Sequence, residues 1–189
     1  GGSISALAGS LAAALTEMVA GLTIGKKKYA EVEEEMKAAI EPMHAFCEHL
    51  LDDIKRDSES FDLYMQALTL PKETEEEKAA RQEAMQNGLK AAVAVPLSVA
   101  KRAYEIMPYA EVMVTKGNKT AVTDALVATM MARTAVLGAL FNVKINLESI
   151  KDEAFVAETT KEVEVLEKKA IEHEQKILAK AGVSKSVVE

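Results

Sequence analysis

GNKTAVTDALVATMMARTAVLGALFNVKINL, residues 117–147, is the stretch of the sequence that decides the fold. Almost every position after Asn118 is apolar or small, which predicts one long helix surrounded by other helices. Beyond Lys119 its charged residues are Asp124, Arg133 and Lys144, which recur about every ten positions, so no uninterrupted run approaches the roughly 20 apolar residues that a membrane span needs. The many alanines let neighbouring helix backbones come close. This stretch therefore predicts the central helix of a helical core.

The composition of the whole chain is typical of a helical protein. Of the 189 residues, 49% are hydrophobic but only 4% are aromatic, and Ala, Leu, Val, Met, Glu and Lys dominate. The length suits one domain with a sizeable core. We therefore expect an all-α fold with a single domain over residues 1–189, a bundle of about six to seven helices around the long apolar helix.

Charge and cysteine usage restrict the partners and the compartment. The net charge of −7 argues against a nucleic-acid or anionic membrane surface and favours a small molecule or a protein as partner. The single Cys47 excludes an internal disulfide and a cysteine-based zinc cluster, which favours a reducing, cytoplasmic setting, and we expect this side chain to be buried. The three histidines lack paired metal-ligand spacing, so we predict no metal.

The first helix is predicted from an Ala-, Leu- and Gly-rich run over residues 4–24 whose only charge is Glu17. Ser3 is a plausible N-cap of this helix. Gly1 and Gly2 would let the backbone approach a ligand, so that the free N–H groups could hold a carboxylate or a phosphate. An ordinary capped helix start is the alternative.

A lysine cluster follows the end of this helix at Gly25. Lys26, Lys27 and Lys28 come directly before an amphipathic helix whose other face is rich in glutamate. These lysines could form a solvated turn near the end of the helix, or a site for the anionic tail of a ligand.

The helix after Pro42 contains the most informative irregularity. An apolar stripe at steps of three or four continues through this helix only if position 57, an aspartate, is counted as a member. An aspartate in such a stripe either pairs with a basic group or is desolvated, and a desolvated carboxyl group suits general acid/base chemistry. An internal salt bridge and a local opening of the bundle to water remain as alternatives.

Further signals set the remaining helix ends. Thr74 and Glu77 form a capping box, and Asp152 is a predicted N-cap of the last helix, which Gly182 closes. Pro96 is expected to kink the helix before the central one, and Pro108 is expected to end it.

Two asparagines, Asn142 and Asn146, lie four residues apart on one face of the central helix. A buried amide must find hydrogen-bond partners, here either a neighbouring helix or a ligand.

Several stretches together resemble the formiminotetrahydrofolate cyclodeaminase family over nearly the whole chain. Motifs in the matching order are Gly1-Gly2-Ser3, Gly25 to Tyr29, Asp57-x-x-x-Phe61, Leu70-Pro71, Ala92-Val93-Ala94-Val95-Pro96-Leu97, Gly117-Asn118, Thr123-Asp124 and Phe141-Asn142-Val143-x-x-Asn146-Leu147. The resemblance implies an all-helical homodimer that converts 5-formiminotetrahydrofolate to 5,10-methenyltetrahydrofolate and ammonia.

The resemblance also implies roles for individual residues. Asp57 matches the catalytic aspartate, which would act as acid and base without a metal or redox cofactor. The other folate-binding candidates are Gly1, Gly2 and Ser3 toward the reacting end or one anionic group, Lys27 and Lys28 toward the glutamate tail, and Asn118, Asp124, Asn142 and Asn146 toward the rest of the substrate. Asp124 and Asn142 are separated by 18 residues, about 27 Å in a continuous helix, so they cannot touch one small group.

Two competing functions remain open at this point. Methenyltetrahydrofolate cyclohydrolase activity occurs among relatives with the same helical pattern and would use the same carboxyl group. A non-catalytic helical assembly module would instead have a fully apolar stripe, and Asp57 counts against it.

Overall fold

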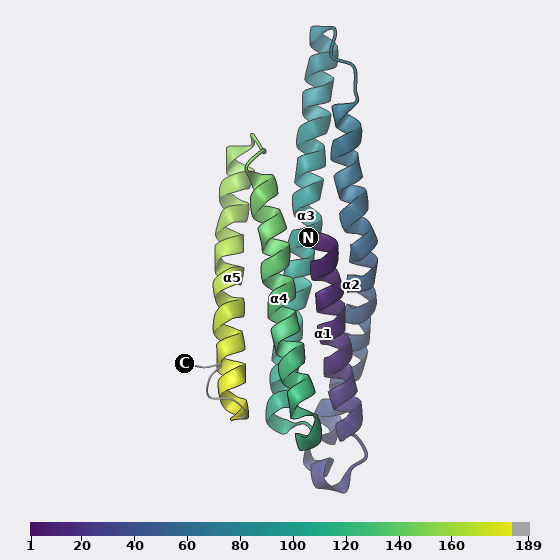
Figure 1. The fold of residues 1–189 in the computed structure, drawn as a ribbon, viewed down its shortest axis with the longest axis vertical. Helices are drawn as coiled ribbons and strands as arrows, with labels where there is room; N and C mark the ends of the chain where they lie inside the picture. The colour runs from purple at the N-terminus through teal and green to yellow at the C-terminus, as the bar shows by residue number, and fades with distance from the viewer. Residues whose placement is uncertain (183–189) are drawn as a thin grey trace.

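The computed structural model of the protein describes residues 1–182 and shows an all-α bundle, as predicted (Figure 1). In the described part of the chain there are five α-helices, fewer than the six to seven helices expected, together with two short 3-10 helices. The elements are α1 (Gly2–Thr23), η1 (Lys27–Val32), α2 (Glu33–Leu68), α3 (Glu75–Lys116), η2 (Lys119–Ala121), α4 (Val122–Leu147) and α5 (Glu153–Ala181).

The difference in helix number comes from prolines that do not end helices. α2 continues through Pro42, and α3 continues through both Pro96 and Pro108, so the prediction that Pro108 ends a helix is wrong. A proline removes one helical hydrogen bond, but a long helix that packs on its neighbours on both sides of the proline can tolerate that loss.

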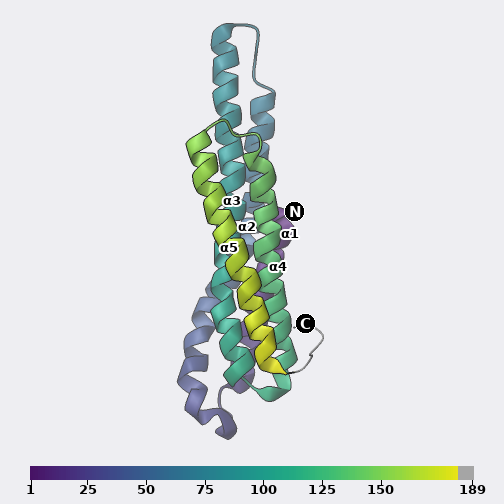
Figure 2. The same cartoon turned by 90° about the vertical axis from the view of Figure 1, so that its left-hand side faces the viewer.

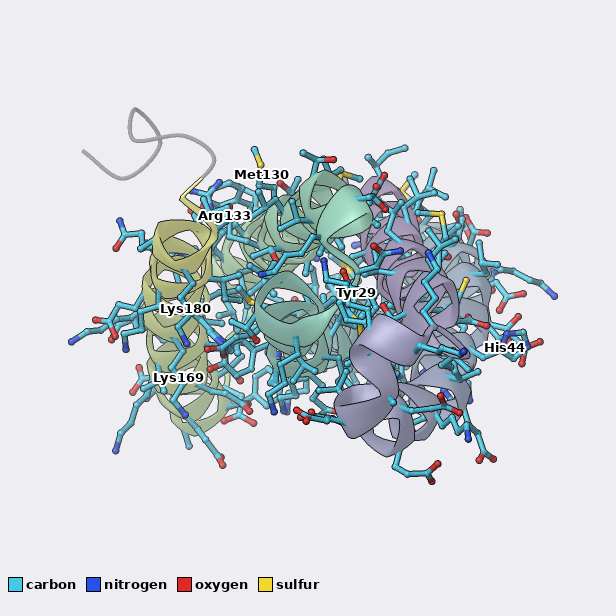
Figure 3. The ribbon with its side chains drawn as sticks, turned by 90° about the horizontal axis from the view of Figure 1, so that it is seen from below. Tyr29, His44, Met130, Arg133, Lys169 and Lys180 are labelled. Atoms are coloured by element: carbon cyan, nitrogen blue, oxygen red, sulfur yellow. The ribbon has the colours of Figure 1, made fainter. Side chains whose placement is uncertain are left out.

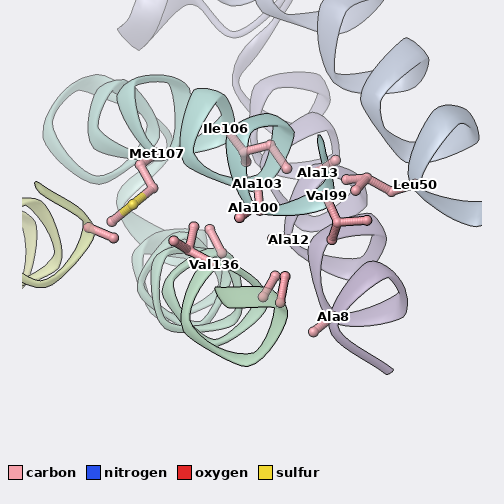
Figure 4. Close-up of a cluster of buried hydrophobic side chains, with 14 of the residues drawn as sticks. Ala8, Ala12, Ala13, Leu50, Val99, Ala100, Ala103, Ile106, Met107 and Val136 are labelled. Carbon is pink, nitrogen blue, oxygen red and sulfur yellow. The ribbon is translucent and has the colours of Figure 1, made fainter. Parts of the chain in front are cut away.

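The predicted central helix corresponds to η2 and α4, and α4 packs between α1, α3 and α5. Figure 4 shows where α1, α3 and α4 meet: Ala12, Val99, Ala103 and Val136 fill this part of the core, and all four are fully buried. Small side chains on α1 and α4 let the backbones come close.

α4 is less enclosed than its sequence indicated, and so is α1. Apolar side chains on one face of each helix are exposed, with Met130 pointing away from the bundle (Figure 3). By length and composition, Gly2–Thr23 and Lys119–Leu147 could each cross a membrane, although 56% and 44% of their most apolar windows are buried in the bundle. Core helices of soluble proteins have the same length and composition.

α2 and α3 extend beyond the first turn of α1 as a two-helix hairpin (Figures 1 and 2). This explains where the predicted apolar stripe fails. Leu50 is fully buried against the core, but Phe61 and Met65 lie on the extension and are exposed. Asp57 therefore lies where the packed bundle opens, which was one of the alternatives for its position in the stripe.

Most predicted helix ends are confirmed. Thr74 and Glu77 form the capping box, the Asp152 side chain accepts a hydrogen bond from the Phe155 N–H, and Gly182 has the left-handed conformation that ends α5. Ser3 is not an N-cap, because it lies inside α1 and the cap residue is Gly1. Cys47 is only half-buried, with its Sγ 3.2 Å from Ser10 Oγ.

Candidate functional site

Asp57 on α2 lies against the first turn of α1. Ser3 Oγ donates a hydrogen bond of 2.8 Å to Asp57 Oδ2, so the hydroxyl that would have capped the helix instead orients the carboxylate. A Cβ atom at Gly2 would overlap Asp57 Oδ1, which explains why this position needs glycine. The partial positive charge of the α1 N-terminus thus faces an acidic group of the protein itself.

The half-buried Asp57 side chain forms part of the wall of a cavity of about 380 Å³. α2 also contributes Ser60, and α3 contributes Ala92. The end of α4 supplies Asn142 and Asn146. Gly1 completes this side of the cavity, so three of the predicted site segments, far apart in the sequence, meet here.

The two cavity asparagines use their amide nitrogens on backbone carbonyls. Asn142 Nδ2 donates to Gly138 O at 2.7 Å, and Asn146 Nδ2 donates to Ala92 O at 2.9 Å. Within residues 1–182, neither Oδ1 atom accepts a hydrogen bond from a protein donor. Together with the Asp57 carboxylate, these two oxygens are hydrogen-bond acceptors on the wall, which Gly1 and Ser58 also line.

Asp57 differs sharply from Asp53, one helical turn earlier. The Asp53 side chain is fully buried and forms ion pairs with Arg56 and Arg102. In the described part of the chain, Asp57 forms no ion pair, so the internal salt bridge that was one alternative for Asp57 is not present. Asp53 forms such salt bridges instead. Sequence analysis missed Asp53, although its place four residues before Asp57 and three before Arg56 is a signal that could have found it.

The remaining predicted site residues lie at the opposite end of α1 and α4. Lys27 and Lys28 are exposed in η1, and Lys28 Nζ lies 5.6 Å from the centre of the Tyr29 ring. Asp124 is in the first turn of α4. Because α4 is continuous, Asp124 and Asn142 do not meet in one cavity of this chain.

Asn118 is also at this end and is fully engaged by the protein. Its Nδ2 donates to Leu22 O, and its Oδ1 accepts hydrogen bonds from Thr120 and from the Tyr29 hydroxyl. Its backbone N–H donates to Thr23 Oγ1. These contacts join the end of α1 to η1 and η2, so a structural role accounts for all of its hydrogen-bonding groups.

A larger hollow, of about 620 Å³, lies between α3 and α5, at the side of Lys169 and Lys180 in Figure 3. Three of its polar side chains pair with one another: hydrogen bonds from Lys180 and then His173 hold the pKa of Glu111 below its usual value. Nearby on α5, burial raises the pKa of Glu174, and Arg133 opposes that shift.

Metal binding has no geometric support in the described ranges. Over residues 1–182, no three His, Cys, Asp or Glu side chains gather in a group that could hold a metal ion.

Comparison with known proteins gives consistent matches. The family model described as formiminotransferase-cyclodeaminase matches residues 1–165. A methenyltetrahydrofolate cyclohydrolase of Methylorubrum extorquens is 42% identical over 166 residues, which are 88% of this chain and 80% of that protein. A formimidoyltransferase-cyclodeaminase of Gallus gallus is 38% identical over 179 residues, 95% of this chain but only 33% of the chicken protein. The chain thus spans about a third of that relative.

The fold matches as well as the sequence. The crystal structure of formiminotetrahydrofolate cyclodeaminase from Thermotoga maritima superimposes with a TM-score of 0.85 and 31% sequence identity, over 100% of this chain and 88% of that chain. The resemblance seen in the sequence motifs is therefore confirmed over the whole bundle. This chain belongs to the formiminotransferase-cyclodeaminase family.

Proposed function

We propose that this chain is a formimidoyltetrahydrofolate cyclodeaminase, which closes 5-formiminotetrahydrofolate to 5,10-methenyltetrahydrofolate and releases ammonia. The relatives are folate-processing enzymes, and one solved relative is a formiminotetrahydrofolate cyclodeaminase. The observation on which the proposal rests is the Asp57 carboxylate: it lies on the cavity wall, a hydroxyl orients it, and no ion pair occupies it within residues 1–182.

The chemistry needs one group that accepts a proton and then returns it. The second folate nitrogen attacks the formimino carbon and forms a tetrahedral centre, while the Asp57 carboxylate accepts the proton that this nitrogen loses. Asp57 then transfers the proton to the former formimino nitrogen. The carbon–nitrogen bond to that nitrogen breaks, ammonia leaves, and the methenyl bridge remains. Because both nitrogens belong to one bound molecule, correct orientation supplies much of the rate.

The acceptor-rich cavity suits this substrate. A protonated formimino group carries N–H donors, and the departing nitrogen gains a further one as ammonia forms. Asp57 and the free oxygens of Asn142 and Asn146 are acceptors for such donors. In this proposal the two amides orient the substrate and Asp57 moves the proton.

Methenyltetrahydrofolate cyclohydrolase is the second candidate, because a cyclohydrolase is 42% identical to this chain and matches over 80% of its own length. In that reaction Asp57 would accept a proton from a water molecule as it attacks the methenyl carbon.

One pair of assays on purified protein separates the candidates. We expect 5-formiminotetrahydrofolate to yield ammonia and methenyltetrahydrofolate in equal amounts, faster than any enzyme-dependent loss of methenyltetrahydrofolate absorbance. Reactions without protein control for spontaneous hydrolysis. Enzyme-dependent hydrolysis without ammonia release would assign the cyclohydrolase instead, and activity in neither assay would overturn both proposals.

We further propose that the protein acts as a homodimer through the outer face of α1 and α4. This face carries apolar side chains that are 38% to 69% exposed: Ile4, Leu7, Leu11, Met18 and Leu22 on α1, and Val127, Met130, Phe141 and Ile145 on α4. Their spacing puts each set on one side of its helix. A groove of about 460 Å³ between Ile4 and Phe141 adjoins the cavity, because Gly1 and Asn142 line both. A second copy on this face would thus border the site.

Sedimentation at micromolar concentration tests the dimer. We expect twice the mass of one chain, and a monomer when Leu11→Glu and Met130→Glu place charges on the apolar face. Lys161→Glu on the exposed side of α5 is the control and should leave the mass unchanged. A wild-type monomer, or wild-type protein that floats with lipid vesicles instead of pairing, would contradict the proposal.

A further inference from the structure

Pro96 interrupts the hydrogen-bonding of α3 beside the cavity without breaking the helix. Proline has no N–H, so the carbonyl four residues earlier, on Ala92, has no helical donor. Pro96 and Ala92 are both buried, and α3 continues on both sides of them. A buried carbonyl without a donor destabilises a protein, so this one needs a partner from outside its helix.

Asn146 on α4 is that partner. Its Nδ2 donates to Ala92 O at 2.9 Å, in place of the N–H that Pro96 lacks. Because a carbonyl can only accept, the amide must present its nitrogen to Ala92, which leaves Oδ1 for other contacts. Asn146 and Ala92 both line the Asp57 cavity, and no donor in the described part of the chain contacts that oxygen.

We propose that Pro96 is a positioning residue for the substrate. By leaving the Ala92 carbonyl without a helical donor, it holds the Asn146 amide in the orientation in which Oδ1 accepts a hydrogen bond from an N–H group of the ligand. The substrate class is therefore one with N–H donors, such as an amidine or an aminopyrimidine edge. This inference rests on the proposed function for its kinetic test, but its structural part can be tested without activity.

Pro108 shows that a proline in α3 does not by itself recruit an amide. It lies in the same helix and is exposed, and the carbonyl that it leaves without a helical donor belongs to Tyr104. No asparagine or glutamine side chain within residues 1–182 donates to that carbonyl. Pro108→Ala is therefore a matched control for Pro96→Ala.

A double-mutant cycle tests whether Pro96 acts through Asn146. Asn146→Ala should raise the KM for 5-formiminotetrahydrofolate roughly five- to tenfold, the scale of one lost hydrogen bond. Pro96→Ala should raise it roughly threefold, because a carbonyl can accept two hydrogen bonds and the amide is loosened rather than released. In the Asn146→Ala background, Pro96→Ala should have no further effect. Additive effects, or an equal effect of Pro108→Ala, would overturn the proposal.

Pro96→Ala and Pro108→Ala are both expected to fold, because alanine is a much better helix former than proline. If the protein lacks cyclodeaminase activity but binds tetrahydrofolate, the same cycle is measured on Kd, and the inference stands or falls separately from the proposed function. If no folate binds, the NMR signals of the Asn146 side-chain amide decide. They should shift upon Pro96→Ala and not upon Pro108→Ala, and unchanged signals would refute the proposal.

Discussion

At the end where α1 begins, Asn142 and Asn146 use their amide nitrogens on backbone carbonyls, and within residues 1–182 no protein donor contacts their oxygens. At the opposite end of the same helix pair, Asn118 has protein partners for both its nitrogen and its oxygen. The first pair lines a cavity with Asp57, whereas Asn118 joins helix ends. Residue type thus does not distinguish a candidate site residue from a structural one, but the hydrogen-bond partners of each polar atom do.

The two aspartates on α2 repeat this contrast within one turn. Asp53 is fully buried between two arginines, and Asp57 is half-buried with a hydroxyl as its partner. We therefore expect mutations around Asp53 to change the free energy of unfolding, and mutations of Asp57 to change turnover.

Arg102→Met should have the largest effect on stability. It leaves the buried Asp53 carboxylate with only Arg56, and we expect a loss of about 3 kcal/mol, the low end for breaking a buried pair, because one partner remains. Chemical denaturation measures this. Adding Asp53→Leu should recover most of the loss, since the unpaired buried charge is then gone. An unchanged unfolding midpoint for Arg102→Met would mean that the ion pairs contribute nothing to stability.

Asp57→Asn should lower turnover by about a hundredfold or more, because an amide cannot accept and return the proton. The protein should stay folded, since Asp57 forms no ion pair in the described part of the chain. Asp57→Leu should likewise keep or gain stability. Steady-state rates of ammonia release together with denaturation curves test both variants, and near-normal turnover of Asp57→Asn would remove this residue from the mechanism.

Local signals were enough to predict the all-α class, the caps of α3 and α5 and the place of α4. The apolar stripe on α2 also pointed to Asp57. The buried part of the stripe stops there because α1, which covers it, begins at Gly2 and does not extend further along α2. The pattern of one helix does not show where a neighbouring helix begins. The engagement of Asn118 could not be predicted, since its partners Thr23 and Tyr29 are about 90 residues away in the sequence. The helix count was wrong because packing, not proline content, decided the ends of α2 and α3.

Asn118→Ala should reduce stability by about 2 kcal/mol, because it removes the hydrogen bonds that the Asn118 side chain makes with Leu22 O and with the Tyr29 hydroxyl, both partly buried. We expect the KM for the monoglutamate substrate to stay nearly constant in this variant. The measurements are thermal or chemical unfolding and steady-state kinetics on the same preparation. A large rise in KM with unchanged stability would instead return Asn118 to the substrate-binding residues and would weaken the contrast between the two ends.

The smallest effect is expected from the exposed lysines of η1. A polyglutamate tail carries repeated negative charges, and Lys27 and Lys28 are an exposed basic pair. Lys27→Ala with Lys28→Ala should therefore raise the KM for a polyglutamylated folate a few-fold and hardly change that for the monoglutamate. The difference should shrink in high salt, because salt screens exposed charges. Stability should change little.

Lys161→Ala with Lys169→Ala on α5 changes the net charge equally and controls for that change.

Asp57 lies beside the start of α1, and Lys27 and Lys28 follow its end. This helix is about 30 Å long, so one chain cannot bring Asp57 and this lysine pair to one short ligand. In a dimer with a two-fold axis across the middle of α1 and α4, the lysines of one copy would lie beside the cavity of the other. A selective loss of polyglutamate binding would thus favour a site completed by two copies, and equal effects on both substrates at low salt would assign the lysines to the solvated surface.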